Sequence, residues 1–275
     1  MAGDARPIGV FDSGVGGLTV FQALERALPH ESLVYLGDTA RVPYGTKSAE
    51  TVVRYTLEAA RFMLRQQVKM VVVACNTASS VALEAMERET RLPVLGVIAP
   101  GARRAVERSA SARIGVIGTR ATVASGAYKR AIQALLPEAE VLSQACPLFV
   151  PLAEEGWTEG DITRRIAERY LEPFQRAEVD TLVLGCTHYP LLRGVIAQVM
   201  GPRVGLVDSA EAVAEEAARA LSGPTRADAA RGVHHFYVTD APETFQVVAE
   251  RFLGRPIHCL EWASLEREAG RPARS

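Results

Sequence analysis

An uninterrupted apolar run, Met-Val-Val-Val-Ala at residues 70–74, leads directly into Cys75. A run of this length and composition favours a strand that is buried on both faces, which is typical of a parallel sheet. Asn76 and Thr77 come next, and both residue types commonly begin helices. Because 78–88 reads as a helix, Cys75 is predicted at the carboxyl end of a strand and beside the amino end of a helix. Ligands collect at that edge of an open α/β sheet, and a helix amino terminus stabilises a thiolate there.

The same succession of strand and helix recurs along the whole chain. Regular alternation implies right-handed crossovers between parallel strands, so we predict an α/β fold with mostly parallel sheets flanked by helices. The pair Pro100-Gly101 interrupts the pattern, and the next helix is expected at 102–109. Another helix is expected from a turn at 118–122 to about Leu136. The other expected strands cover residues 7–11, 32–37, 94–98, 113–117, 141–145, 180–185, 204–207, 233–239 and 257–261.

Two parts of the chain resemble each other and indicate two similar domains. Ile-Gly-Val occurs at 8–10 and again at 114–116, each time at the start of an expected strand. The segment 68–75 aligns with 179–186, and both segments end in a cysteine. The matching position of the two cysteines carries more weight than the similarity of two apolar strands.

Strands expected after Asp208 have no counterpart in this repeat, so we assign the carboxyl-terminal segment to the first domain. We therefore predict a discontinuous domain, residues 1–98 and 208–275, around an inserted second domain, residues 99–207. The active site is predicted in the cleft between them. A linker is expected at 222–228, and the charged tail from Ser264 is expected to fray.

Composition excludes several classes of protein. The net charge of −1 gives no indication of nucleic acid or membrane binding, and no apolar run is long enough for a transmembrane helix. The short polar start predicts no signal peptide. The cysteines form no Cys-x-x-Cys pair, so a reduced, cytoplasmic protein without a structural zinc site is expected, and Cys146 and Cys259 are interpreted as structural. The histidines show no spacing typical of a metal site, so no metal is predicted.

If the two halves face each other across a cleft, Cys75 and Cys186 reach one ligand from opposite sides. One thiolate then removes a proton from one face of a carbon centre, and the opposite thiol returns a proton to the other face. A free thiol has a pKa of about 8.5, so a mixed pair near neutral pH needs only modest tuning. The arrangement indicates inversion of a stereocentre. Two independent core cysteines are the alternative interpretation.

Residues beside the two cysteines favour a small amino acid as the ligand. Backbone amides and hydroxyls where helices begin bind carboxylates, and this environment is expected around Asn76, Thr77, Thr187 and His188. His188 is interpreted as a general acid that supports Cys186, with helix capping as the alternative. A Cys–His hydrolase is a competing use of this pair, but it leaves Cys75 unexplained. A binding protein with a two-lobed cleft would give no reason for paired cysteines.

Asp12 and Ser13 lie on another strand-to-helix turn, before the glycines of 14–17. This turn lacks the Walker lysine and does not match Gly-x-Gly-x-x-Gly, and a carboxylate at its entrance would repel phosphate. Asp12 is better suited to an ammonium group or to a polar relay to a thiol, with a helix cap as the alternative. Residues 44–45, Tyr-Gly, are expected to shape a loop over the cleft. Two further acids are candidates for tuning the sites, or are simply solvated, namely Asp38 and Glu154.

Several motifs together identify a family. They cover the segments 11–17, 35–45, 74–79, 146–152 and 184–190. In these segments the chain closely resembles the cofactor-independent glutamate racemases of the aspartate/glutamate racemase superfamily. The resemblance extends to about Ala210.

The resemblance implies interconversion of L-glutamate and D-glutamate for bacterial peptidoglycan synthesis, with no cofactor, in a cytoplasmic homodimer. It assigns Cys75 and Cys186 as the acid/base pair, supported by Asp38 and Glu154. Aspartate or hydantoin racemization within the same superfamily is the alternative activity. The implied substrate contacts are Asp12, Ser13, Tyr44, Gly45, Asn76, Thr77, Thr119, Thr122, Thr187 and His188.

Overall fold

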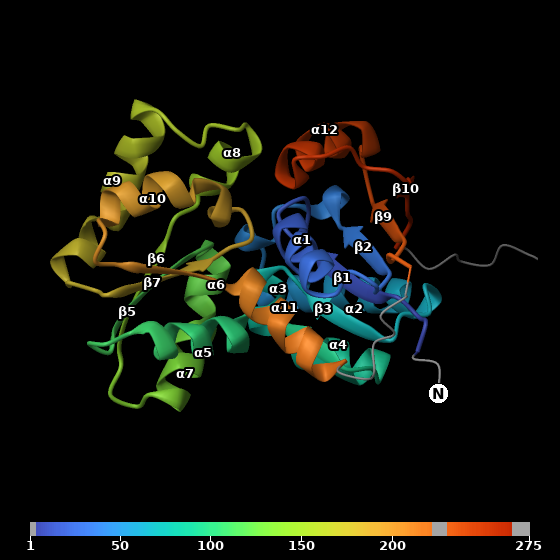
Figure 1. Ribbon diagram of the computed structural model, residues 1–275, viewed down its shortest axis with the longest axis horizontal. Coiled ribbons are helices and arrows are strands. Elements are labelled where there is room, and N and C mark those ends of the chain that lie inside the picture. Colours follow the sequence, from blue (N-terminus) through green and yellow to red (C-terminus); the bar gives the residue numbers. More distant parts are fainter. Residues whose placement is uncertain (1–3, 222–229, 266–275) are drawn as a thin grey trace, which may run out of the picture.

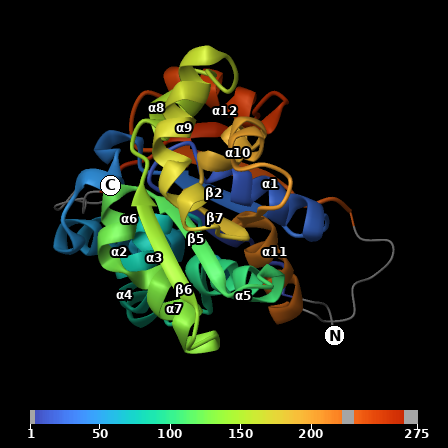
Figure 2. The ribbon, with the colours of Figure 1, turned by 90° about the vertical axis from the view of Figure 1, so that its left-hand side faces the viewer.

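The structure is a computed structural model that describes residues 4–221 and 230–265. The described strands form two parallel sheets, each covered by helices on both faces, as Figures 1 and 2 show. The prediction of an α/β fold with two mostly parallel sheets is therefore confirmed. No helix in the described ranges is long and apolar enough to cross a membrane. The expected linker at 222–228 and the tail beyond 265 lie outside the described residues.

The first sheet has the strand order β10-β9-β2-β1-β3-β4, and every neighbouring pair is parallel. We call this sheet and the helices packed on it the first lobe. Its strands are β1 (Ile8–Asp12), β2 (Leu33–Gly37), β3 (Met70–Val73), β4 (Val94–Gly96), β9 (His234–Val238) and β10 (Leu260–Trp262).

The second sheet has the order β6-β5-β7-β8, again with parallel neighbours, and forms the second lobe with its helices. This order repeats β2-β1-β3-β4 of the first sheet, so β1 corresponds to β5 and β3 to β7. The aligned sequence segments thus occupy equivalent places in the two sheets. The domain boundaries at 98 and 208 stay a prediction. The strands are β5 (Arg113–Gly118), β6 (Glu140–Ala145), β7 (Thr181–Gly185) and β8 (Gly205–Asp208).

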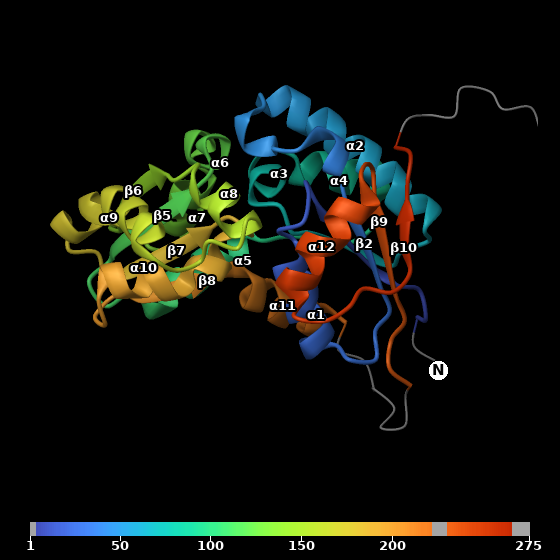
Figure 3. The same ribbon diagram turned by 90° about the horizontal axis from the view of Figure 1, so that it is seen from above.

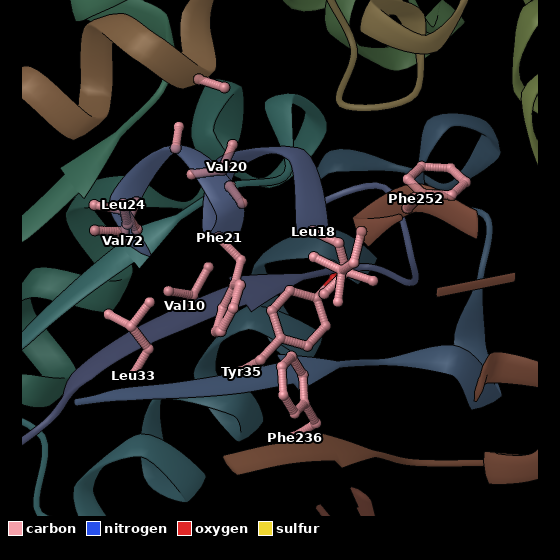
Figure 4. Close-up of a cluster of buried hydrophobic side chains, with 14 of the residues drawn as sticks. Val10, Leu18, Val20, Phe21, Leu24, Leu33, Tyr35, Val72, Phe236 and Phe252 are labelled. Carbon is pink, nitrogen blue, oxygen red and sulfur yellow. The ribbon is translucent and has the colours of Figure 1, made fainter. Parts of the chain in front are cut away.

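Alternate residues of each first-lobe strand enter different apolar clusters, because successive side chains of a strand point to opposite faces. Val10 and Tyr35 pack with helices α1, α11 and α12, whereas Phe11 and Leu36 pack with α2 and α4. Figure 4 shows the first of these clusters around Phe21. The helices that cover this sheet are α1 (Leu18–Ala27), α2 (Ala49–Arg65), α3 (Asn76–Val81), α4 (Leu83–Thr90), α11 (Ser209–Ala220) and α12 (Pro242–Leu253).

The second sheet is covered in the same way. Helices α8, α9 and α10 pack on one face, and α5 and α7 on the other, while the short α6 follows β5 (Figure 2). These helices are α5 (Ile98–Arg108), α6 (Arg120–Ser125), α7 (Ala127–Leu135), α8 (Phe149–Glu154), α9 (Asp161–Arg176) and α10 (Arg193–Met200).

Several expected element boundaries are wrong. The helix expected over 78–88 is divided at Ala82, and the helix expected up to Leu136 is divided at Gly126, which has a left-handed φ of 64°. The helix expected to begin at 102 begins at Ile98 and includes Pro100-Gly101. Proline is tolerated there because the first turn of a helix does not need its missing N–H.

Two of the shorter strand predictions also change. The strand expected at 94–98 ends at Gly96, and the one expected at 257–261 is shifted to Leu260–Trp262. Cys146 is buried, in agreement with a structural role, whereas Cys259 is exposed and has a left-handed φ of 58°. Its position next to β10 therefore gives it no role in the core.

Candidate active site

The two cysteines of the repeat lie at equivalent strand ends. Cys75 follows β3 and is the residue immediately before α3, and Cys186 directly follows β7. Both are nearly buried, and both line one cavity of about 140 Å³ between the lobes. A water molecule needs about 10–15 Å³ on this measure, so the cavity accepts a molecule of on the order of ten non-hydrogen atoms.

Cys75 is held within the first lobe. Its Sγ lies 3.5 Å from Ser13 Oγ, on the turn after β1. Burial raises the pKa of Cys75 to about 12, with a further contribution from the Asp12 carboxylate. Contacts with the Ala78 backbone and with Ser13 act in the opposite direction and offset only part of this increase. The thiol is therefore the form of Cys75 in the free protein at neutral pH.

Asp12 ends β1 and is fully buried behind Ser13. Its Oδ2 accepts a hydrogen bond of 3.0 Å from the Gly14 backbone N–H. Burial raises the pKa of Asp12, and the charge of His188 partly opposes this. Gly17 must be a glycine here, because a Cβ at this position would lie 2.4 Å from Asp12 Cβ.

Cys186 is part of a relay in the second lobe. His188 Nδ1 lies 3.8 Å from Cys186 Sγ, and His188 Nε2 lies 2.9 Å from Glu154 Oε1 at the end of α8. Burial of the ring opposes its charged form, but the contacts with Cys186 and Glu154 outweigh burial and raise the pKa of His188 to about 10. A histidine that is cationic at neutral pH favours a thiolate beside it.

Hydroxyl groups join the lobes at the cavity. Thr77 Oγ1 of α3 lies 3.0 Å from Thr119 Oγ1 and 3.1 Å from Thr122 Oγ1, and both partners belong to the start of α6. Thr119 also caps α6 by accepting a hydrogen bond from the Thr122 backbone N–H. Asn76 Oδ1 accepts a hydrogen bond of 2.7 Å from Tyr128. Its Nδ2 has no hydrogen-bond partner among the described residues, so this amide can donate to a bound carboxylate.

The loop after β2 closes another side of the cavity. Tyr44 lines the cavity and donates a hydrogen bond to Asp38, which anchors the tyrosine. Asp38 is fully buried and also accepts hydrogen bonds from Arg41 and Thr239. Gly45 packs against Thr119 so closely that a Cβ would lie 2.6 Å from Thr119 Cβ.

Comparison with known proteins identifies the family. The family model described as Asp/Glu/Hydantoin racemase matches residues 8–217. The chain belongs to this racemase family. Curated relatives include a glutamate racemase from Geobacter metallireducens, 54% identical over 96% of this chain and 98% of the relative. Another is a glutamate racemase from Syntrophus aciditrophicus, 51% identical over 95% of this chain and 98% of the relative.

Solved racemase structures share the fold. The glutamate racemase of Francisella tularensis, in complex with D-glutamate, has a TM-score of 0.87 and 38% identity and covers 95% of this chain and 98% of its own. That of Thermus thermophilus, in complex with beta-chloro-D-alanine, has a TM-score of 0.85 and 46% identity and covers 96% and 99%. The resemblance that the sequence motifs predicted is therefore confirmed.

Most of the predicted racemase site residues line the same cavity, although their roles stay predictions. Those that do not line it stand behind residues that do. Asp12 lies behind Ser13 and Cys75, Glu154 behind His188, and Thr122 behind Thr77. The predicted residues on the cavity wall are Ser13, Tyr44, Gly45, Cys75, Asn76, Thr77, Thr119, Cys186, Thr187 and His188.

Asp38 is the predicted supporting residue that is most clearly removed from the cavity, since it anchors Tyr44 from behind. Several lining residues were missed, although most of them belong to the motifs that suggested the family. No local signal indicates Tyr128, which reaches Asn76 from a helix 52 residues further along the chain. The missed lining residues are Val42, Pro43, Thr46, Arg120, Pro147, Val150 and Pro151.

Proposed function

We propose that this racemase-family chain interconverts L-glutamate and D-glutamate by a two-base mechanism with Cys75 and Cys186, and that it supplies D-glutamate for peptidoglycan synthesis. The observation that carries the mechanism is that equivalent strand ends of two similar lobes bring both thiols to one small cavity. Relatives with about half of their residues identical to this chain, over nearly its full length, are glutamate racemases. Substrate and reaction follow from this similarity.

In either direction, one cysteine as thiolate removes the proton from Cα, and the other cysteine as thiol donates a proton to the opposite face. After the turnover the two cysteines have exchanged protonation states, so the product enantiomer is the substrate of the reverse reaction. The imidazolium of His188 is placed to stabilise the thiolate of Cys186. Asp12 and Ser13 occupy the corresponding place beside Cys75.

Deprotonation at Cα leaves charge that must be stabilised beside the carboxylate. The amino terminus of α3 and the free Nδ2 of Asn76 supply hydrogen-bond donors on one wall of the cavity. The hydroxyls of Thr77 and Thr119 add polar contacts at the junction of the lobes. The size of the cavity and these donors fit a small amino acid, and its identity as glutamate rests on the similarity to the relatives.

The test is racemization of L-glutamate in D2O by the purified protein without added cofactor, followed by chiral chromatography and by deuterium incorporation at Cα. We expect Cys75→Ser and Cys186→Ser each to lose at least about a hundredfold in rate, because each removes one of two essential proton carriers. Full racemase activity in either variant would contradict the two-thiol mechanism. A higher rate on aspartate than on glutamate would contradict the substrate.

The homodimer rests on the family resemblance alone, whereas the cytoplasmic location also rests on the pattern of cysteines in the sequence. Both are part of the proposal. Size-exclusion chromatography with light scattering measures the first. A monomer at the concentration used for the assay, with full activity, would contradict an obligatory dimer.

A further inference from the structure

Helix α12 belongs to the first lobe but contacts the second lobe beside the catalytic relay. It packs on the first sheet through Phe245 and Ala249. In Figures 1 and 3 its carboxyl-terminal part faces α8 of the other lobe. There, Arg251 Nη1 donates a hydrogen bond of 2.6 Å to the backbone carbonyl of Glu154. This bond joins residues that are 97 positions apart and holds the residue whose side chain contacts His188.

The next residue of α12 contacts His188 itself. The rings of Phe252 and His188 meet edge to face, with centroids 5.7 Å apart and planes at 87°. Phe252 is buried and belongs to the apolar cluster of the first lobe. Two consecutive residues of one helix therefore contact both partners of the Cys186 relay.

The chain after Glu154 is shaped to receive Arg251. Gly156 has a left-handed φ of 75°, and a Cβ at this residue would lie 3.0 Å from Arg251 Nη1. A glycine permits both this backbone conformation and the close approach of the guanidinium. Residues of both lobes, Arg251 of the first and Gly156 of the second, therefore shape this contact.

We propose that Arg251 and Phe252 are positioning residues that hold Glu154 and His188 in line with Cys186, so that this relay is complete only when the first lobe closes on the second. The proposal rests on the racemase function proposed above. The positioning role of Arg251 and Phe252 would make proton transfer at Cys186 depend on lobe closure more than proton transfer at Cys75 does. The contacts of Cys75 with Ser13 and Asp12 lie within the first lobe, whereas the Cys186 relay depends on a helix of the opposite lobe.

Arg251→Met removes the hydrogen bond to Glu154 and keeps most of the apolar side chain, at a site that is exposed. The direct readout is the titration of the His188 ring by NMR in the full-length protein. Among the described residues, the titratable groups that act on this ring include Cys186, Glu154 and, across the lobe boundary, Asp12. The charged guanidinium of Arg251 lies on the backbone of Glu154. We expect the midpoint to fall below the value of about 10 that these contacts support, because Glu154 is no longer held against the ring.

The second readout is the kinetics of glutamate racemization. We expect kcat to fall roughly tenfold with little change in KM, because misplacing a catalytic group by a fraction of an ångström affects the transition state and leaves substrate binding intact. Arg251→Lys keeps a donor and should recover part of both effects. Arg255→Met is the matched control, since Arg255 pairs with Glu25 inside the first lobe and should leave both readouts unchanged.

A His188 titration in Arg251→Met that matches the unmodified protein would overturn the proposal, whatever the activity. Phe252→Leu gives an independent test, because it keeps an apolar side chain and removes the ring contact. It should lower kcat for glutamate with little change in KM, and an unchanged kcat would contradict a positioning role for Phe252. Equal shifts in the Arg255→Met control would also overturn the proposal, since they would show a general loosening of the first lobe. Inactivity of the unmodified protein on glutamate would reject the proposed function, while the titration would still decide the role of Arg251.

Discussion

The side chains around the two thiols differ in charge although the thiols occupy equivalent positions. Cys75 lies near the buried carboxyl group of Asp12, which disfavours a second negative charge. Cys186 lies beside an imidazole that holds its proton well above neutral pH. A reaction that runs in both directions needs both thiols to change protonation state. The substrate carries its own ammonium and carboxylate groups. Its binding must therefore change which of the two thiols is deprotonated.

The charge of His188 gives the first prediction. An unfolded histidine has a pKa near 6.5, and folding raises the pKa of His188 to about 10, so folding stabilises the charged ring. This contribution is complete below pH 6.5 and is lost as the pH rises towards 10. We expect the difference in free energy of unfolding between the unmodified protein and His188→Gln to shrink by at least about 1 kcal/mol between pH 6.5 and 9.5. Urea unfolding at the two pH values measures it, and a constant difference would contradict the raised pKa.

The sequence alone predicts the positions of side chains that directly follow strands. It does not predict side chains that distant segments of the chain bring to the site. Cys75 and Cys186 could be placed because an apolar run fixes where a buried strand ends. The contact of Arg251 with Glu154 could not be predicted, since no pattern near either residue refers to the other. The same limit applies to Asp38, which the sequence offered only as a candidate for tuning the sites. Only the structure shows its carboxylate turned to Arg41 and Thr239.

Short helices deliver polar groups to the cavity. Helices α3 and α6 have six residues each; Thr77 lies in the first turn of α3, and Thr119 is the residue that caps the start of α6. The sequence pattern is helical across both boundaries, so it did not predict where α3 ends before α4 or where α6 ends before α7. At Gly126 the break is a left-handed residue, which glycine adopts without strain. At Ala82 the sequence contains no comparable signal, so tertiary packing decides where the helix turns.

The close approach of the loop after β2 to α6 gives the second prediction. In Gly45→Ala the new Cβ would meet Thr119 at 2.6 Å and push the loop away from α6. We expect KM for glutamate to rise roughly tenfold because the cavity wall moves, with a loss of about 1–3 kcal/mol in the free energy of unfolding. Steady-state kinetics and urea unfolding measure these effects.

Gly194→Ala is the control for this substitution. Gly194 lies in α10, and a Cβ there would have nothing within 4 Å. The helix should gain up to about 1 kcal/mol, and the kinetics should not change. An unchanged KM in Gly45→Ala would show that the loop adapts and does not shape the cavity.

The two lobes are connected through a pair of helices that pack on each other. Helix α5 follows β4 of the first sheet and packs on the second, while α11 follows β8 of the second sheet and packs on the first. The internal repeat predicted two similar halves, and the matching strand orders agree with it. How the halves face each other could not be read from the sequence, because it depends on contacts such as α5 with α11 and α12 with α8, which join distant segments.

The third prediction concerns what holds these two helices together. Two kinds of contact compete for this role, close packing and charge. A Cβ on Gly101 of α5 would lie 3.1 Å from Ser209 Cβ at the start of α11, so the helices are in close backbone contact there. Arg104 and Glu215 form an exposed ion pair across the same pair of helices, at 2.6 Å. Exposed pairs contribute about 1 kcal/mol or less, because water screens them.

We therefore expect Gly101→Leu to cost about 1–3 kcal/mol in the free energy of unfolding and to lower kcat/KM, because the wedge changes the angle at which the lobes close. Arg104→Ala should cost less than about 1 kcal/mol and leave kcat/KM nearly unchanged. Urea unfolding, glutamate kinetics and small-angle X-ray scattering on both variants measure this contrast. If Arg104→Ala were the more damaging change, charge and not packing would set the lobe angle. The same ion pair would then make closure sensitive to salt, which a series of kinetic measurements at increasing ionic strength would reveal.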